Sequence, residues 1–267
     1  MKLSIYDNLK HIVAQLVKIF KIKLNPAKTG RPRKISQLNS LALALYQHAS
    51  TRQTKKSIYN DCKKNLKCSY KTLVCAINES SFLALRLLFH LIRLNKRKAH
   101  LIKYTDSTDL PVCLKKNADK HQTMKGLASF GYSAKGWYYG LKLTLTRDCQ
   151  GQILGLRITT PKTPDREIFK DINSDLDGIL VADAGYTSKK LEREMYQENK
   201  RWVLTKPFKT MRRLATFWQL AIYHGRFQIE FDFRSLKLFF GLITSFPRSI
   251  NGYLSNYIHS LLAFALR

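Results

Sequence analysis

The spacing of apolar residues divides the chain into two parts with different periodicities. In the first hundred residues, apolar positions recur at steps of three and four in the segments LALALYQHA, SIYNDCKKNL and SSFLALRLLFHLIRLNKRKA. This spacing is typical of helices that bury one face, and it lacks the alternation of a strand. We therefore predict an all-helical N-terminal region over residues 1–99.

The pattern changes near residue 100. HLIKYTD, WYYGLKLTLTRD and QILGLRITT have the composition and alternation of three consecutive strands. A helix over DREIFKDI, an apolar strand in GILVADAG, a helix over SKKLEREMYQEN and a strand in RWVLTKPF follow, and the chain closes with helices. This order predicts an α/β domain over residues 100–267, in which helices flank a mixed sheet.

The segment YHGRFQIEFDFRSLK, residues 223–237, is compatible with two structures. FQIEFDF alternates with period two, as a strand would, whereas Ile229, Phe233, Leu236 and Phe240 follow helical steps that continue beyond the alternating part. The longer pattern favours a helix. On a helix, four polar side chains of this segment would lie within roughly 60° of arc on one face. They are Tyr223, Arg226, Glu230 and Lys237.

The charge of the chain points to a polyanionic partner. It has 47 Lys and Arg against 18 Asp and Glu, a formal net charge of +29. Nucleic acid is the leading candidate, because basic side chains that neutralise phosphates release condensed counterions. An anionic membrane surface or simple solubility are the alternatives. The stretch NPAKTGRPRKIS, residues 25–36, is either a basic linker or an arm that lies in a minor groove, with Arg31, Arg33 and Lys34 as its DNA contacts.

Other features of the sequence indicate the cellular compartment of the protein. The apolar run SFLALRLLFHLI is too short to span a bilayer and contains Arg86 and His90, so we expect no membrane segment. No secretory signal is apparent at the N-terminus, and five cysteines without a CxxC pair indicate reduced thiols. We therefore expect a cytoplasmic protein.

Two aspartates are placed where catalytic groups occur in open α/β sheets, at the ends of predicted strands. Asp106 closes HLIKYTD and Asp183 follows the apolar run at 178–182, although either could simply cap a turn. Glu230 would supply a third carboxylate. Three converging acids could bind hard divalent cations, and two such ions can stabilise both oxygens of an in-line phosphoryl displacement.

The motif Tyr-x2-Arg-x3-Glu-x6-Lys, formed by Tyr223, Arg226, Glu230 and Lys237, resembles the signature of DDE transposases encoded by bacterial insertion sequences, in their IS-four-like branch. YTDSTDLPVC resembles the segment with the first catalytic aspartate of that family, and LVADAGYTS the segment with the second. The likeness covers about residues 100–260.

The resemblance implies an RNase H-like catalytic domain that cleaves DNA at the ends of a mobile element and joins it to target DNA. It implies that Asp106, Asp183 and Glu230 are catalytic and bind Mg²⁺ or Mn²⁺ as two ions, and that Tyr223, Arg226 and Lys237 contact DNA. It further implies a bacterial protein that is associated with the nucleoid. It also implies a homo-oligomer on DNA and no nucleotide cofactor; GLASFGYS has the glycines of a phosphate loop but no following lysine. One departure is Thr144, where many relatives have histidine.

Two alternative functions remain open. The chain could be a catalytically inactive DNA-binding regulator derived from a transposase, or a structure-specific nuclease that cuts without joining. Other acids near the motifs could replace a member of the triad, namely Asp109, Asp165 and Asp232. Trp137 and Tyr138 could stack on an exposed base or pack at the edge of the sheet.

Overall fold

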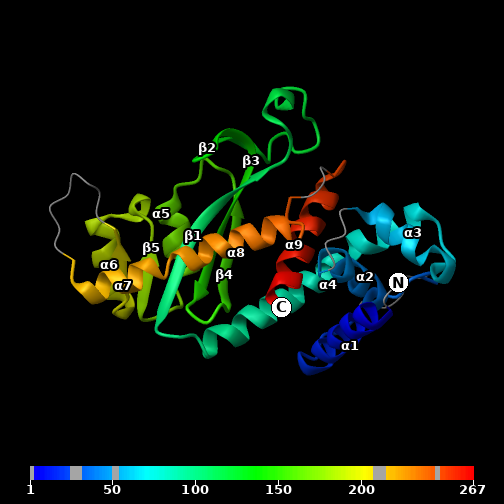
Figure 1. Cartoon of the computed structure of the whole chain (residues 1–267), viewed down its shortest axis with the longest axis horizontal. Helices are drawn as coiled ribbons and strands as arrows, with labels where there is room; N and C mark the ends of the chain where they lie inside the picture. The colour runs from blue at the N-terminus through cyan, green and yellow to red at the C-terminus, as the bar shows by residue number, and fades with distance from the viewer. Residues whose placement is uncertain (1–2, 25–31, 50–53, 207–214, 244–246) are drawn as a thin grey trace. The chain divides into compact units, whose positions relative to one another are not determined.

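The computed structural model of the chain describes residues 3–24, 32–49, 54–206, 215–243 and 247–267. They form two compact units (Figure 1). The helical unit comprises Met1–Leu91 and Ser235–Arg267, and the sheet unit comprises Ile92–Arg234. The C-terminal segment therefore belongs with the N-terminal helices, from which it is distant in sequence.

The described part of the helical unit is built from α1 (Leu3–Ile19), α2 (Gln37–Ala49), α3 (Lys55–Leu66), most of α4 (Tyr70–Arg97) and α9 (Ile250–Ala265). Helix α2 is buried from Ser40 to His48 and contacts both α1 and α9. Its apolar residues surround the helix, which is the pattern of a core helix. By length and composition α4 could cross a membrane, but this is weak evidence, because a core helix of a soluble protein passes the same test.

The sheet unit contains strands β1 (Ile102–Pro111), β2 (Ser129–Ser133), β3 (Gly136–Asp148), β4 (Ile153–Thr159), β5 (Ile179–Ala182) and β6 (Trp202–Thr205). The strands lie in the order β2-β3-β1-β5-β6, with β4 also paired to β3. The β1–β3, β2–β3 and β3–β4 pairs are antiparallel, whereas β1–β5 and β5–β6 are parallel. The sheet is thus mixed, as the sequence predicts.

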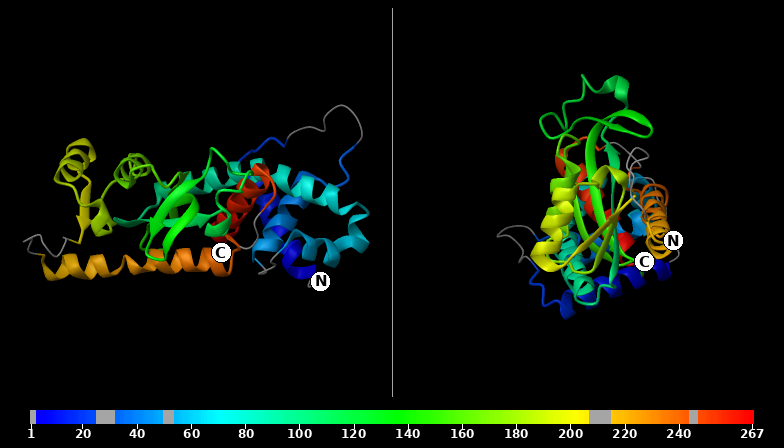
Figure 2. Two further views of the ribbon diagram at one scale, coloured as in Figure 1. Left: turned by 90° about the horizontal axis from the view of Figure 1, so that it is seen from above. Right: turned by 90° about the vertical axis from the view of Figure 1, so that its left-hand side faces the viewer.

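Helices lie on both faces of this sheet. Helices α5 (Asp165–Ile172) and α6 (Lys189–Asn199) lie on one face, and α7 (Phe217–His224) with the first part of α8 (Phe227–Leu238) lies on the other (Figure 2). Residues Phe169, Leu180, Tyr186 and Met195 belong to the apolar core beneath α5 and α6. This arrangement confirms the predicted fold class, an α/β domain consistent with an RNase H-like fold that follows a helical N-terminal region.

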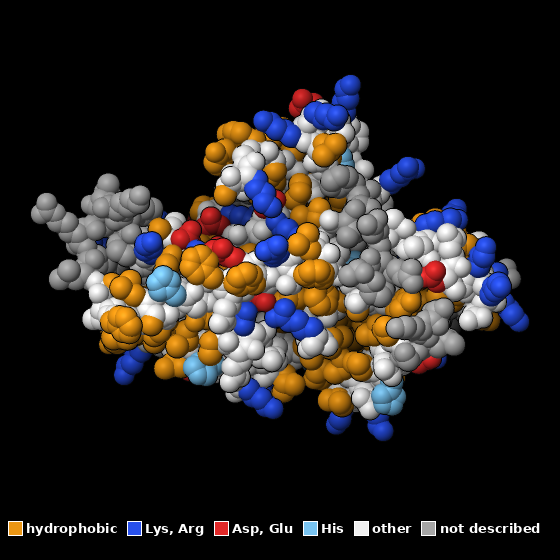
Figure 3. All heavy atoms as spheres, in the orientation of Figure 1, with side chains coloured by type: hydrophobic (Ala, Val, Ile, Leu, Met, Phe, Trp, Pro, Cys, Tyr) orange, Lys and Arg blue, Asp and Glu red, His pale blue; other side chains and the backbone are white. Residues whose placement is uncertain are grey.

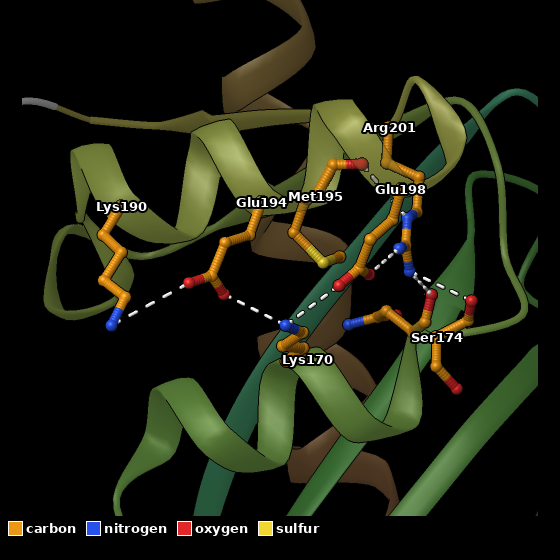
Figure 4. A network of polar contacts seen from close by, with 8 residues as sticks. Lys170, Ser174, Lys190, Glu194, Met195, Glu198 and Arg201 are labelled. Carbon is orange, nitrogen blue, oxygen red and sulfur yellow. Dashed lines mark hydrogen bonds and ion pairs between the residues drawn. The ribbon is translucent and has the colours of Figure 1, made fainter.

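A polar network ties α5 to α6 and to the start of β6 (Figure 4). Lys170 on α5 lies 3.0 Å from Glu194 and 2.9 Å from Glu198 on α6. The buried guanidinium of Arg201 donates to the carbonyls of Asn173 and Ser174, at the C-terminal end of α5, over 2.9 and 3.0 Å. Cations at the end of a helix satisfy carbonyls that lack intrahelical partners.

The structure differs from the sequence prediction in three local respects. Strand β1 continues past Asp106 to Pro111, because Ser107–Pro111 pair with β3 residues 140–144, so Asp106 is in the middle of the strand. Strand β2 is not predicted by the alternation pattern. The predicted single helix over 223–237 is two helices, α7 and α8, separated at Gly225 and Arg226.

Candidate active site

Adjacent strands of the sheet unit bring Asp106 and Asp183 to the same region. Strands β1 and β5 are parallel neighbours, with Tyr104 opposite Val181. Two residues further along, this register places Asp106 beside Asp183, which follows β5 and caps the short helix at 184–186. The side chains of these two acids therefore come together because the strands that carry them are paired.

Helices α7 and α8 add the remaining polar groups. Arg226 donates from Nη1 to Asp106 Oδ2 over 2.9 Å and from Nη2 to Glu230 Oε1 over 2.8 Å. Tyr223 donates from its hydroxyl to Asp183 Oδ1 over 3.3 Å. The structure thus brings together five of the residues that the sequence singles out, all in the sheet unit. Figure 3 shows acidic side chains gathered on the face occupied by α7 and α8.

Asp106 is the most enclosed of the three acids. Its side chain is 18% exposed, and its Oδ1 accepts a hydrogen bond from its neighbour, the Ser107 amide, over 2.8 Å. Burial raises the pKa of Asp106 to about 6, and the nearby charges of Asp183 and Glu230 also raise it. The Ser107 amide and Arg226 stabilise the carboxylate but do not offset these effects.

Asp183 and Glu230 are more accessible to solvent. Asp183 is exposed, and its Oδ1 accepts from the Ala184 amide over 2.8 Å, so it also has the turn-capping role that its sequence allows. Glu230 is on the first turn of α8, and its side chain is 47% exposed. A cation approaching from solvent can therefore reach these two carboxylates more easily than Asp106.

Arg226 is held tightly at the junction of the two helices. Its side chain is only 10% exposed, and its guanidinium carbon lies 5.7 Å from the centre of the Tyr223 ring. Gly225 precedes it, and a Cβ atom at this position would overlap the hydroxyl of Tyr104 on β1. The close approach of the helix junction to β1 therefore requires glycine, and it sets Arg226 against Asp106.

The other predicted DNA-contacting residues lie apart from this cluster in the chain. Lys237 is in the last turn of α8, within the helical unit. Arg33 and Lys34 are exposed residues of the helical unit, and Arg33 lies 3.8 Å from Glu79. Arg31 lies outside the described residues. Their roles in DNA binding stay predictions.

The acids that could be confused with the triad have other partners. Asp232 is buried and pairs with Arg147, also buried, over 2.7 Å. Asp165 pairs with Lys142 over 2.6 Å and is the first residue of α5. Asp109 is within β1.

Hydrogen bonds of Ser107, which the sequence pattern does not indicate, support the strand next to Asp106. The hydroxyl of Ser107 bonds to Tyr186 Oη over 2.9 Å and to Thr144 Oγ1 over 2.8 Å. Because side chains alternate along β1, Ser107 points to the face opposite Asp106. This contact joins β1 to the segment after Asp183, so it helps to fix the spacing of the two acids. The only sequence signal was that Ser107 follows Asp106 directly and Tyr186 lies three residues after Asp183.

The chemistry of the donor set fits a hard divalent cation, since three carboxylates supply anionic oxygen ligands. The Arg226 guanidinium links two of these carboxylates, those of Asp106 and Glu230. Among the described residues, no group of three or more His, Cys, Asp or Glu side chains is spaced to hold a metal ion.

The sheet unit corresponds to a known family. Residues 96–248, more than half of the chain, match the family model described as the transposase DDE domain. No curated protein matches the chain. The matched region contains β1, the segment after β5 and all of α8, and so it includes the three acids and Arg226. The chain therefore belongs to the family of DDE transposase domains.

Proposed function

We propose that the chain is the transposase of a bacterial insertion sequence, of the branch with the Tyr-Arg-Glu-Lys signature. It hydrolyses one DNA strand at each end of the element and then joins the freed 3′ hydroxyl to target DNA. The observation that carries this proposal is the convergence of Asp106, Asp183 and Glu230 around Arg226, within the region that matches the DDE family.

Asp106, Asp183 and Glu230 would hold Mg²⁺ or Mn²⁺, in the family's manner as two ions. When bound, such ions activate the attacking oxygen and stabilise the leaving oxygen of an in-line displacement at phosphorus. The protein's own contribution is positioning. The paired strands fix the two aspartates, and α8 brings Glu230 toward them.

Arg226 has two roles in this proposal. Without a metal it neutralises Asp106 and Glu230, two carboxylates that would otherwise repel each other. With metal and DNA bound, its planar guanidinium is suited to a phosphate, which it can contact through two parallel hydrogen bonds. Tyr223, beside it, would contact the DNA backbone through its hydroxyl.

The partner is double-stranded DNA: the terminal inverted repeats of the element and the target. The net charge of +29 supports a polyanionic partner. Lys237, Arg31, Arg33 and Lys34 would add contacts outside the catalytic cluster, within a DNA-binding region at 1–99 and on α8. We expect a homo-oligomer on DNA, because two ends must be processed together, and a cytoplasmic protein without a nucleotide cofactor or membrane segment.

A catalytically inactive, DNA-binding derivative is the second candidate. Such a protein would bind the same DNA through its basic side chains without cutting it. An RNase H-like nuclease that does not join DNA is distinguished by its products.

The test is cleavage and joining of a labelled duplex that carries the element's own terminal repeats, with Mg²⁺ or with EDTA. The wild type is compared with Asp183→Asn and with Asp175→Asn, an exposed aspartate that pairs with Lys96. We expect metal-dependent nicks and joined products, lost in Asp183→Asn and retained in Asp175→Asn. Nicks without joining would support the nuclease, and salt-sensitive binding without nicks would support the inactive derivative.

A further inference from the structure

An aromatic ladder covers one side of the β2–β3 hairpin. Phe130 is paired with Tyr139 and Tyr132 with Trp137 across the two strands. The rings of each pair meet edge to face, with centroids 5.2 and 5.5 Å apart. Cross-strand neighbours and alternate residues share a face, so all four rings are on the same side of the hairpin.

This aromatic face is open to solvent. Tyr132 is 72% exposed, Trp137 57% and Phe130 43%. The opposite face of the hairpin is packed, because a Cβ atom at Gly131 would overlap the ring of Pro161. The hairpin is therefore held from behind while it presents its large rings outward. Several exposed aromatic rings in one place mark a binding surface more often than an isolated exposed residue does.

The surroundings of the ladder are basic. The turn of the hairpin carries Lys135, and the connection between β1 and β2 carries Lys115, Lys116, Lys120 and Lys125, all exposed. Within the described part of the chain none of these five lysines has an acidic partner, and Asp119 is the single acid among residues 112–137. In Figure 3 hydrophobic and basic side chains gather at the top of the view, over this connection and the hairpin. The charge indicates an anionic partner.

The ladder and the catalytic cluster share one face of the sheet. Asp106 is opposite Leu145 in the β1–β3 pair, so their side chains point the same way. Trp137 lies eight residues before Leu145 on β3, an even step, and the register is unbroken between them. Trp137 and Tyr139 thus point to the side of Asp106, and Trp137 is roughly 26 Å from it along the strand. This distance corresponds to about eight base pairs of DNA.

We propose that the β2–β3 hairpin is a second DNA-contact surface, on which Tyr132 and Trp137 stack against bases that are unpaired or unstacked while the neighbouring lysines bind phosphates. Aromatic rings beside a basic surface are the usual means of holding single-stranded nucleic acid. The proposal rests on the proposed function only for the identity of the DNA. A second copy of the chain would also cover aromatic rings, but its own net charge of +29 does not complement a surface with five lysines.

The direct test uses tryptophan fluorescence, because the chain has three tryptophans: Trp137, Trp202 and Trp218. Trp202→Phe/Trp218→Phe leaves Trp137 as the reporter, and Trp137→Phe/Trp218→Phe leaves Trp202, which is on β6 at the other edge of the sheet and is similarly exposed, at 53%. Each variant is titrated with a mixed-sequence single strand of about 20 nucleotides. We expect strong, salt-sensitive quenching of Trp137 and little change at Trp202.

A binding measurement gives an independent readout. The variant Tyr132→Ser/Trp137→Ser is compared with Tyr196→Ser/Trp202→Ser, a matched pair of exposed rings in the same unit. By anisotropy of the labelled single strand, we expect the first variant to lose about tenfold or more in affinity and the second less than about twofold. Circular dichroism verifies that both fold.

Three outcomes would overturn the proposal: unquenched Trp137, equal affinity of both double variants for DNA, or conversion of a DNA-free dimer to a monomer by Tyr132→Ser/Trp137→Ser alone. The last would identify a second copy of the chain as the occupant. Quenching of Trp137 in an Asp183→Asn protein separates binding from chemistry. If the wild type fails to cleave but Trp137 is quenched, the proposed function fails while the hairpin surface stands.

Discussion

Arg226 lies between Asp106 and Glu230 and donates one hydrogen bond to each carboxylate, over 2.9 and 2.8 Å. Two of these residues are four apart in sequence, whereas Asp106 is 120 residues from Arg226. The guanidinium therefore joins the middle of the sheet to the helix that supplies the third acid. It is the centre of the candidate active site in this structure. Because its contacts contribute to stability, the arrangement of the site can be tested by unfolding measurements without DNA.

Replacement of Arg226 should destabilise the protein. Arg226→Ala leaves Asp106 with no cationic partner, and we expect a loss of about 2 to 3 kcal/mol in the free energy of unfolding near neutral pH. Urea denaturation measures this. The control is Arg234→Ala, an exposed arginine on the same helix, for which we expect a change within about 0.5 kcal/mol. Equal effects of the two substitutions would contradict the bridging role of Arg226.

The raised pKa of Asp106 predicts a pH-dependent effect of its neutral replacement. The pKa is about 6 in the folded protein against an ordinary value of 3.8, so the folded state binds this proton more tightly. The associated stability is fully present below about pH 4 and is lost as pH rises through about 6. The asparagine side chain does not titrate. The free energy of unfolding of Asp106→Asn, relative to that of the wild type, should therefore rise by on the order of 2 kcal/mol as pH increases across this range.

The measurement is urea denaturation of both proteins at about pH 4.5 and pH 7.5. Asp171→Asn, at an exposed position on α5, serves as the control and should show no comparable pH dependence. A stability difference between Asp106→Asn and the wild type that does not change with pH would show that Asp106 is not enclosed as described.

The pattern of apolar residues was sufficient to predict the order of most helices and strands. Periodicity depends on which face each segment buries, and this is a local property of the sequence. The full length of β1 was not predictable in this way, because Ser107, Thr108 and Asp109 are extended by pairing with β3, a contact distant in sequence. The break between α7 and α8 depends on the approach of Gly225 to Tyr104, which is also a tertiary contact.

The sequence was sufficient to predict which residues form the candidate site, but not how they contact one another. Asp106, Asp183, Glu230, Arg226 and Tyr223 were named from their spacing and from a family resemblance, and the structure brings them together. Their hydrogen bonds were not predictable, since these join residues on different elements. The buried pair of Arg147 and Asp232 has no signature in the pattern, as its members are 85 residues apart.

That buried pair yields a prediction that separates structural acids from catalytic ones. Asp232→Ala leaves the charge of Arg147 buried without its partner and should cost about 3 kcal/mol of stability. Glu230→Gln, two residues earlier and half exposed, should change stability by less than about 1 kcal/mol while abolishing cleavage. Thermal denaturation and the cleavage assay together check this. A stable but inactive Asp232→Ala protein would contradict this assignment, because it would give the catalytic role to Asp232 instead of Glu230.

The helix junction should tolerate no side chain at residue 225. Gly225→Ala places a methyl group against the Tyr104 hydroxyl, and we expect a loss of about 1 to 3 kcal/mol from overpacking. Gly185→Ala is the control, because a Cβ atom there meets nothing within 4 Å. Denaturant titration compares them. If Gly225→Ala were as stable as Gly185→Ala, the junction would not lie against β1 as described.

The most direct test of the central claim is metal-specific rescue at Asp183. Asp183→Cys replaces a hard oxygen ligand with a soft thiolate, which suits Mg²⁺ poorly and Mn²⁺ better. Nicking of a duplex with the element's ends is measured in each metal, with Asp171→Cys as the control. We predict that Asp183→Cys is inactive in Mg²⁺ and regains nicking in Mn²⁺, whereas the control cleaves in both. Undiminished cleavage by Asp183→Cys in Mg²⁺ would contradict a metal-binding role for Asp183 and, with it, the proposed catalytic triad.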